Sequence, residues 1–264
     1  MNEPNAQLAA VAEQLRAVYD TGSPIPPIRD SIASADEAYA VQDLNTAHRL
    51  DAGGRLVGRK IGLTSLAVQR QLGVDQPDYG MLFADMAVDD GAEIAAGRLI
   101  QPKVEAEIAF VLGDDLPHAD TTPADVLRAI DFAVAAIEIV DSRIADWQIS
   151  FYDTVADNGS SGLYVLGSRP VSLEEFDPIL CGMVMERSGE PVSVGAGSAC
   201  LGSPISAAAW LARTMAAAGR PLGVGDTILS GALGPMVAVE PGDAFEARIS
   251  GLGSVTVSFE GASS

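Results

Sequence analysis

The sequence predicts an α+β protein, with a helical N-terminal portion followed by a region made mostly of strands and turns. Apolar residues recur at helical spacing between about residues 6 and 50, whereas the pattern after about residue 80 is mostly that of strands. Strands that are grouped together, with helices set apart, are typical of α+β folds and not of alternating α/β sheets. With 264 residues, of which 48% are hydrophobic, the chain can bury one large core or two small ones.

The predicted helices have recognisable ends. The first ends where Gly22 and a group of prolines begin a loop. The second begins with a capping box, in which Ser34 is the N-cap and Glu37 is the N3 residue. Helices are expected at residues 6–20, 34–50, 65–72, 123–130 and 206–218.

The predicted strands are apolar runs, several of which alternate with polar residues. They are expected at residues 56–63, 103–112 and 132–140, twice within 223–239, and as a hairpin over 245–259. The best candidate for a domain boundary lies near residues 73 to 80. We therefore expect a helical N-terminal portion over residues 1–75 and a β-rich core over residues 76–264, or one continuous domain.

Composition excludes several classes of function. The formal net charge of −20 argues against partners such as nucleic acid or an anionic membrane surface. No apolar run approaches the length of a membrane span and no signal peptide is recognisable, so we expect a soluble cytoplasmic protein. Cys181 and Cys200 fit no metal spacing or disulfide framework and are expected to be small buried residues. His48 and His118 are expected to be surface residues and not metal ligands.

Three glutamates are the strongest functional signal. Glu105 and Glu107 lie two residues apart in a predicted strand, so their side chains project from the same face. Glu138 interrupts a second apolar run, where a carboxylate is costly unless a cation compensates for it. Three oxygen ligands with open positions suit Mg²⁺ or Mn²⁺ better than zinc. The alternative for Glu105 and Glu107 is that they face solvent on an edge strand.

Lysine usage is a second signal. Of the sixteen basic residues, only Lys60 and Lys103 are lysines, and the other fourteen are arginines. A compact amine can shift its pKa and can donate to an oxyanion as a point charge, which a guanidinium cannot do. Chance is the alternative explanation for the survival of Lys60 in the middle of a predicted strand.

No dinucleotide-binding, Walker or nucleophile-elbow motif is present, but seven segments together resemble a known family. The segments are Gly58–Thr64, Leu72–Gly80, Leu82–Met86, Val104–Glu107, Ala156–Gly162, Leu201–Pro204 and Ile228–Leu233. Their order and spacing resemble the 2-oxopent-4-enoate (2-hydroxypenta-2,4-dienoate) hydratases, in the hydratase/decarboxylase branch of the fumarylacetoacetate hydrolase superfamily. The resemblance spans about residues 36 to 250, and seven segments in register make it specific.

This resemblance implies a mixed β-roll core, a homo-oligomer and a small 2-oxo or 2-hydroxy-dienoic acid as substrate. It also implies that one divalent metal ion, Mg²⁺ or Mn²⁺, is bound by Glu105, Glu107 and Glu138. The implied reaction adds water to 2-hydroxypenta-2,4-dienoate and gives 4-hydroxy-2-oxopentanoate, in aromatic or related ring catabolism.

Three further site residues follow from the resemblance. Lys60 matches the family's active-site lysine, and Asp78 matches an acidic residue near it. Ser160 matches a polar position on the substrate side, and Gly159 stands where the family often has alanine. Lys60 is the candidate to stabilise the C2 oxyanion or relay protons, and Asp78 is the candidate to activate water or move the proton. These two roles are interchangeable on this argument.

The nearest alternative is decarboxylation of 4-oxalocrotonate (2-oxohex-3-enedioate), which requires a pocket for a second carboxylate. No basic residue beyond Lys60 is obviously placed for it, although the positions of Arg143 and Arg169 are open. Hydrolytic C–C cleavage, as in fumarylacetoacetase or acylpyruvase, is less well supported because it needs a histidine base and neither histidine lies near a motif. A metal-stabilised protein without catalytic turnover is the non-enzymatic alternative.

Overall fold

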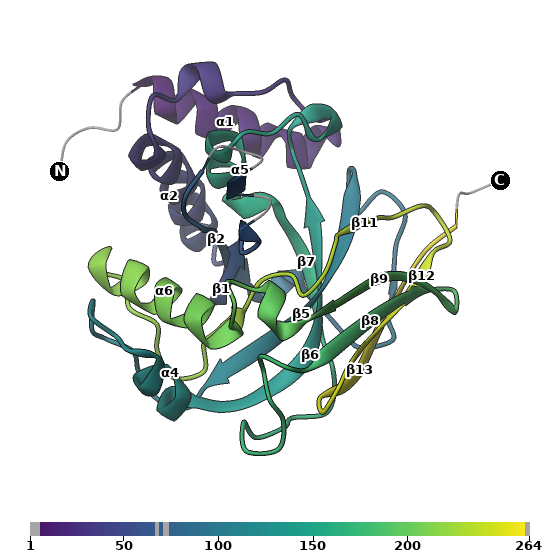
Figure 1. Ribbon diagram of the computed structural model, residues 1–264. Helices are drawn as coiled ribbons and strands as arrows, with labels where there is room; N and C mark the ends of the chain where they lie inside the picture. The colour runs from purple at the N-terminus through teal and green to yellow at the C-terminus, as the bar shows by residue number, and fades with distance from the viewer. Residues whose placement is uncertain (1–5, 67–68, 71–73, 262–264) are drawn as a thin grey trace.

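The fold consists of two sheets and a group of helices, as seen in a computed structural model that describes residues 6–66, 69–70 and 74–261 (Figure 1). The first sheet has eight strands in the order β2-β1-β10-β5-β6-β7-β3, with β11 also paired to β5. The second has five strands in the order β4-β13-β12-β8-β9. The strands of the first sheet are β1 (Leu56–Gly62), β2 (Asp78–Phe83), β3 (Ala87–Val88), β5 (Pro102–Leu112), β6 (Ile130–Asp141), β7 (Ser161–Leu166), β10 (Thr227–Leu229) and β11 (Val237–Ala238). Those of the second are β4 (Glu93–Ile94), β8 (Gly182–Arg187), β9 (Glu190–Ala196), β12 (Ala244–Ile249) and β13 (Gly253–Phe259).

The first sheet is mixed, because β1 runs parallel to β10 and β3 runs parallel to β7, whereas its other pairs are antiparallel. Its two longest strands, β5 and β6, are inner strands paired along their whole length. Residues on both faces of β5 are buried, including Ile108, Ala109 and Phe110 in succession. Most strand pairs are antiparallel and the helices gather in groups beside the sheet, so the α+β prediction is confirmed.

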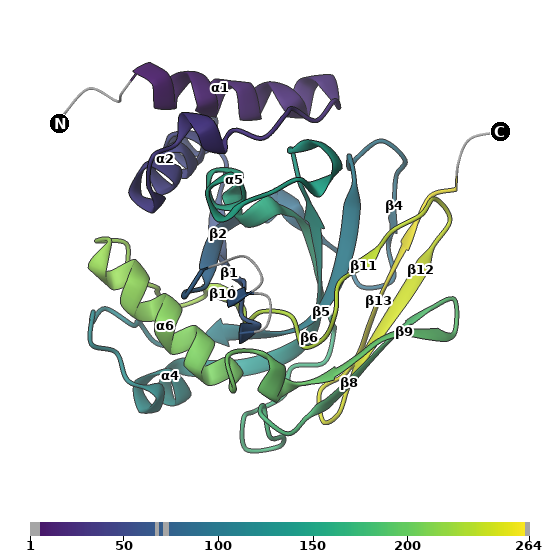
Figure 2. The ribbon, with the colours of Figure 1, turned by 45° about the horizontal axis from the view of Figure 1, so that its top comes forward.

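The helices form two groups on this framework. They are α1 (Ala6–Thr21), α2 (Ala35–Asp51), α4 (Pro123–Ala129), α5 (Phe151–Ala156) and α6 (Pro204–Ala217), with short 3₁₀ turns η1 (Arg29–Ser31), η2 (Ala84–Met86), η3 (Ala145–Trp147), η4 (Asn158–Ser160) and η5 (Gly197–Ala199). Helices α1, α2 and α5 gather at one end of the molecule and share a hydrophobic cluster of their own (Figure 2). Helices α4 and α6 pack against each other on another side of the first sheet. Within the described ranges, no helix is long and apolar enough to cross a membrane.

Four of the five predicted helices are present within a few residues of their predicted ends. The predicted helix over residues 65–72 lies partly outside the described residues. Helix α5 was not predicted, because a run of six residues is too short to show a helical period. In the predicted capping box, Ser34 Oγ accepts from the Glu37 N–H, but Glu37 Oε2 accepts from the N–H of Ala33 and not from that of Ser34.

The predicted domain boundary near residues 73 to 80 follows β1 and overlaps the start of β2 at Asp78. These two strands are antiparallel neighbours in one sheet, with Gly62 opposite Asp78. The division into a portion over residues 1–75 and a core over residues 76–264 stays a prediction.

Candidate active site

Three carboxylates meet at the centre of the first sheet. Glu105 and Glu107 come from β5, and Glu138 comes from β6, where it is the register partner of Glu105. One oxygen from each of the three lies within 4.8 Å of the others. Glu107 and Glu138 are 0% and 1% exposed, and both strands are inner strands. The alternative of an edge strand is therefore wrong, and Glu107 does not face solvent, whereas Glu105 is half-buried. The carboxylates of Glu105 and Glu107 meet on one face, as their spacing predicted.

This cluster is electrostatically unfavourable without a counter-charge. Burial, with the nearby charge of Glu138, raises the pKa of Glu105 to about 7. The same causes raise the pKa of Glu107 well above its usual range. Glu107 Oε2 accepts from the N–H of Gly231 at 2.9 Å, but among the described residues Oε1 has no hydrogen-bond partner. A cation would remove this penalty, because it favours the ionised form of all three groups.

Lys60 reaches this cluster from β1. Its Nζ lies 3.0 Å from Oε1 and 3.2 Å from Oε2 of Glu138, and the hydrogen bond is made to Oε2. In a flat sheet, β1 and β6 would be about 14 Å apart, at about 4.8 Å per strand, so the contact requires a strongly curled sheet. Burial alone would lower the pKa of Lys60, but the carboxylates of Glu138 and Asp78 outweigh it, so the pKa is raised and the amine stays protonated.

Asp78 is the first residue of β2 and lies opposite Gly62. Its side chain is fully buried, and no described side chain donates a hydrogen bond to either oxygen, although the backbone N–H of Gly62 lies close enough to act against the rise of its pKa. Burial raises its pKa to about 6, although Lys60 acts in the opposite direction. A Cβ at Gly62 would lie 2.1 Å from Asp78 Oδ1, so only glycine leaves room for this carboxylate.

Ser160 differs from the other predicted site residues. It is buried in η4, and its hydroxyl donates to Asp157 Oδ2 at 3.4 Å. Asp157 belongs to a different group of side chains, described below, and not to the carboxylate cluster. The structure thus brings together five of the six predicted side chains, and a substrate-side role for Ser160 stays a prediction.

Sequence reasoning missed one residue at the site. Gly231 has a φ of 110°, and a Cβ there would lie 2.4 Å from Thr64, so this glycine is needed to deliver its N–H to Glu107. The sequence signal that could have identified Gly231 is that it lies in Ile228–Leu233, one of the seven segments that carry the family resemblance. Arg143, which the sequence analysis named only as a basic residue of open position, is buried against Asp157 and lies outside the carboxylate cluster.

The remaining candidates behave as predicted. Cys181 and Cys200 are free and buried. His48 and His118 are exposed.

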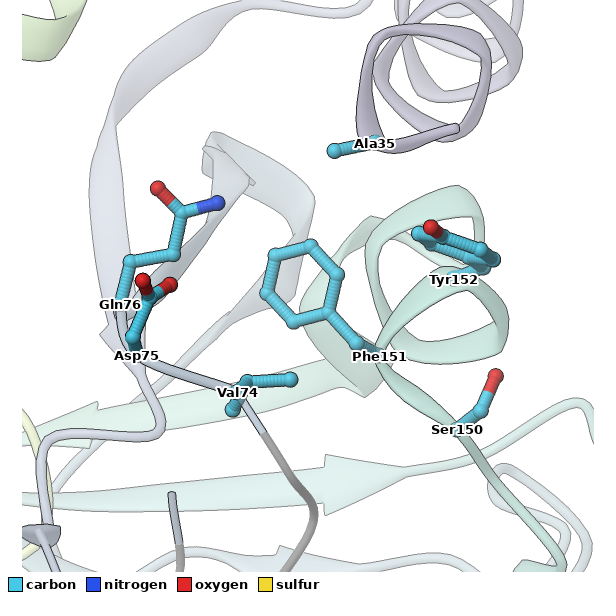
Figure 3. A pocket seen from close by; sticks show the side chains of 7 residues that line it. All are labelled: Ala35, Val74, Asp75, Gln76, Ser150, Phe151 and Tyr152. Atoms are coloured by element: carbon cyan, nitrogen blue, oxygen red, sulfur yellow. The ribbon is translucent and has the colours of Figure 1, made fainter. Parts of the chain in front are cut away.

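A cavity of about 350 Å³ has none of the six predicted site residues in its lining, and Figure 3 shows the side chains that form it. It is lined by Ala35, Val74, Asp75, Gln76, Ser150, Phe151 and Tyr152. Asp75 and Gln76 belong to the segment that leads from β1 into Asp78 on β2. Among the described residues that line this cavity there is no lysine or arginine, so these residues offer no counter-charge to an anionic ligand.

Comparisons with known proteins agree with this arrangement. A family model described as fumarylacetoacetate (FAA) hydrolase C-terminal matches residues 45–260. The chain is 61% identical over 259 residues to the TodF product hydratase of Pseudomonas putida strain F1, covering 96% of this chain and 97% of that protein. It is 62% identical over 252 residues to 2-keto-4-pentenoate hydratase 1 of Dechloromonas aromatica strain RCB, covering 95% and 96%. A solved structure of 4-oxalocrotonate decarboxylase from Pseudomonas putida G7, complexed with magnesium and adipate, matches with a TM-score of 0.93 and 37% identity over 96% of this chain and 97% of that chain.

Proposed function

The chain belongs to the fumarylacetoacetate hydrolase family, and from this premise we propose that it is a metal-dependent hydratase. Its reaction converts 2-hydroxypenta-2,4-dienoate (2-oxopent-4-enoate) into 4-hydroxy-2-oxopentanoate, as a step in the breakdown of aromatic compounds. One observation carries the proposal. A buried amine and a buried, uncommitted carboxylate accompany three clustered glutamates in a chain 62% identical to a 2-keto-4-pentenoate hydratase.

The cofactor is a divalent cation, Mg²⁺ or Mn²⁺, held by Glu105, Glu107 and Glu138. The donor set consists of carboxylate oxygens, which these cations prefer. The unpartnered Oε1 of Glu107 and the raised pKa of Glu105 fit a site that is balanced by positive charge. When bound, the cation supplies positive charge for the carboxylate and the C2 oxygen of the substrate.

Lys60 supplies a protonated amine next to this centre. Its pKa is raised, so it acts as a hydrogen-bond donor and fixed positive charge and not as a base. Such a donor stabilises negative charge on the C2 oxygen while the dienol loses its hydroxyl proton. Arginine would keep the charge but not the compact shape.

Asp78 is the group that moves the proton. A carboxyl with a pKa of about 6 can accept and return protons near neutral pH, and no side chain in the described part of the chain donates to its oxygens. Ketonisation transfers the proton from the C2 oxygen to C5 and gives a 3,4-unsaturated 2-oxo acid. Hydration then adds the hydroxyl of water at C4 and a proton at C3. We propose this assignment for the two roles that the sequence left interchangeable.

Decarboxylation of 4-oxalocrotonate is the second candidate, because the structure of such an enzyme matches with a TM-score of 0.93. That substrate carries a second carboxylate, which needs a cation when it is buried. Arg143 is committed to Asp157, and Arg169 is exposed near Gly253 of the second sheet. Neither arginine is available for that carboxylate.

Lys103 is the cation that the sequence argument overlooked. It lies two residues before Glu105, so both side chains leave β5 from the same face. Its ammonium lies 4.1 Å from the ring centroid of Trp147, which holds it by a cation–π contact. Decarboxylation needs a cation for the second substrate carboxylate, and Lys103 is a candidate for that cation. A variant of Lys103 can therefore distinguish decarboxylation from hydration.

The test compares both substrates on the same enzyme with the same metal. We expect a higher kcat/KM for loss of 2-hydroxypentadienoate absorbance than for CO₂ release from 4-oxalocrotonate. Faster CO₂ release would overturn the proposal. Assembly into a homo-oligomer and a cytoplasmic location stay predictions from the sequence.

A further inference from the structure

The turn η4 has an unusual backbone. Asn158, Gly159 and Ser160 have φ values of 57°, 64° and 52°, so three consecutive residues are left-handed. Ser160 is neither glycine nor asparagine, and such a residue keeps this conformation only when its surroundings impose it. The turn joins α5 to β7 and is followed directly by Ser161 of β7.

The turn packs against both strands that carry the candidate catalytic groups. The side chain of Asn158 makes two hydrogen bonds to the backbone of Met81 on β2, at 2.7 Å and 3.0 Å. A Cβ at Gly80, the register partner of Lys60, would lie 2.3 Å from Asn158 O. A Cβ at Gly159 would lie 3.0 Å from Cε and 3.2 Å from Cδ of Lys60. The turn thus touches the stem of the active-site lysine.

A buried ion pair spans the turn from one end to the other. Arg143 and Asp157 are 1% and 4% exposed, and Arg143 Nε donates to Asp157 Oδ1. The two terminal nitrogens of Arg143 donate to the backbone carbonyls of Asp157 and Ser161, at 2.7 Å and 2.9 Å. Asp157 Oδ2 also accepts from the N–H of Arg143 at 3.0 Å and from the hydroxyl of Ser160. A planar guanidinium can make these contacts together, whereas an amine cannot.

We propose that Arg143 and Asp157 are positioning residues for the amine of Lys60. The ion pair fixes the left-handed turn, and the turn keeps Gly159 against the stem of Lys60. This packing limits the amine to the position in which it meets Glu138. The kinetic consequence rests on the proposed hydratase function, whereas the restraint on Lys60 does not.

The test replaces Asp157 with asparagine and compares it with a matched control. Asp157→Asn keeps the shape of the side chain and removes the charge that pairs with Arg143. Asp153 provides the control, because it is equally buried and pairs with Arg29 at 3.0 Å. Its hydrogen bonds go to Ile28, Arg29 and Ser150, none of which belongs to the turn. Asp153→Asn therefore makes the same chemical change at a side chain that has no hydrogen bond to η4, and it keeps the backbone carbonyl that accepts from the N–H of Asp157.

Two readouts separate positioning from general loss of stability. The first readout is whether a variant changes kcat, KM or both, measured at saturating Mg²⁺. The second is trace acetylation with acetic anhydride, read by peptide mass spectrometry as the ratio of Lys60 to Lys103. These are the only two lysines in the chain, so Lys103 serves as an internal reference. This second readout needs no enzymatic activity.

We expect Asp157→Asn to lower kcat at least about tenfold, with KM and Mg²⁺ affinity changed by less than about threefold. The acetylation ratio should rise severalfold. Arg143→Lys should also lower kcat and raise the acetylation ratio. It keeps the positive charge but loses the planar guanidinium, whose nitrogens donate to Asp157 and Ser161 together. Asp153→Asn should lower the midpoint of urea unfolding and leave kcat and the acetylation ratio near those of the wild type.

An unchanged acetylation ratio in folded Asp157→Asn and Arg143→Lys would overturn the proposal. Equal changes of kcat and of the ratio in Asp153→Asn would also overturn it, because the effect would then be one of stability. Failure of both turn variants to fold, with Asp153→Asn folded, would contradict a local role for the pair. If the wild type does not hydrate the dienoate, the proposed function fails, and the acetylation ratio still decides the role of Arg143 and Asp157.

Discussion

Replacing Lys60 with arginine should lower turnover by roughly 10- to 150-fold while the fold persists. The amine lies 3.0 Å and 3.2 Å from the two oxygens of Glu138, and glycine packing at position 159 encloses its stem. A larger planar guanidinium cannot occupy the same position, so one charge-assisted hydrogen bond to the reacting oxygen is lost or misplaced. Such a bond contributes about 1.5–3 kcal/mol, and each 1.4 kcal/mol of barrier corresponds to about tenfold in rate.

The assay is the loss of dienoate absorbance at saturating substrate and Mg²⁺. Lys103→Arg is the matched control, because it makes the same change at the only other lysine. Far-ultraviolet circular dichroism and the unfolding midpoint establish that Lys60→Arg is folded. A turnover number within about twofold of the wild type would refute the reasoning, because a compact amine would then be unnecessary.

Four further predictions test the site. Glu107→Gln should weaken Mg²⁺ binding at least about tenfold in calorimetry and abolish turnover, and unchanged binding would exclude this side chain as a ligand. Because burial raises the pKa of Glu105 to about 7, the metal-free protein holds a proton there below that pH and a cation must displace it. Mg²⁺ affinity should therefore rise from about pH 6 to about pH 8, by up to about tenfold per pH unit for each proton displaced, and a flat profile would contradict this. Gly62→Ala should lower the free energy of unfolding by about 1–3 kcal/mol and remove most of the activity, because its Cβ would lie 2.1 Å from Asp78 Oδ1. Wild-type stability and wild-type activity in this variant would count against the packing argument. Lys103→Gln should leave hydration within about twofold, whereas a large loss of CO₂ release from 4-oxalocrotonate would identify Lys103 as the partner of a second carboxylate.

Part of the candidate site could be predicted from local sequence. The spacing of Glu105 and Glu107 places both on one face of any strand, whatever its neighbours are. The apolar run around Glu138 indicated that this carboxylate would be buried, and it is 1% exposed. The reason for a glycine near Lys60 could be recognised only from the packing, because Gly62 leaves room for the carboxylate of Asp78.

The direction of Ser160 could not be predicted in the same way. Its hydroxyl donates to Asp157 because the turn around it is left-handed, and that conformation depends on Arg143 from the end of β6. Nothing in the run of residues near Arg143 indicates a partner fourteen positions away. Helix α5 was missed for a related reason, since its six residues gain most of their stability from the cluster shared with α1 and α2.

The sequence alone determined which residue types are available for the chemistry, and which of them share a strand face. It also determined most helix ends, because capping and turn signals act within a few residues. Only the tertiary structure decided that Glu105 lies opposite Glu138, that Lys60 reaches Glu138 across a curled sheet, and that Arg143 is committed to Asp157. The physical reason is that side-chain alternation follows from local backbone geometry, whereas strand order, register and curvature follow from pairing and burial between segments far apart in the chain.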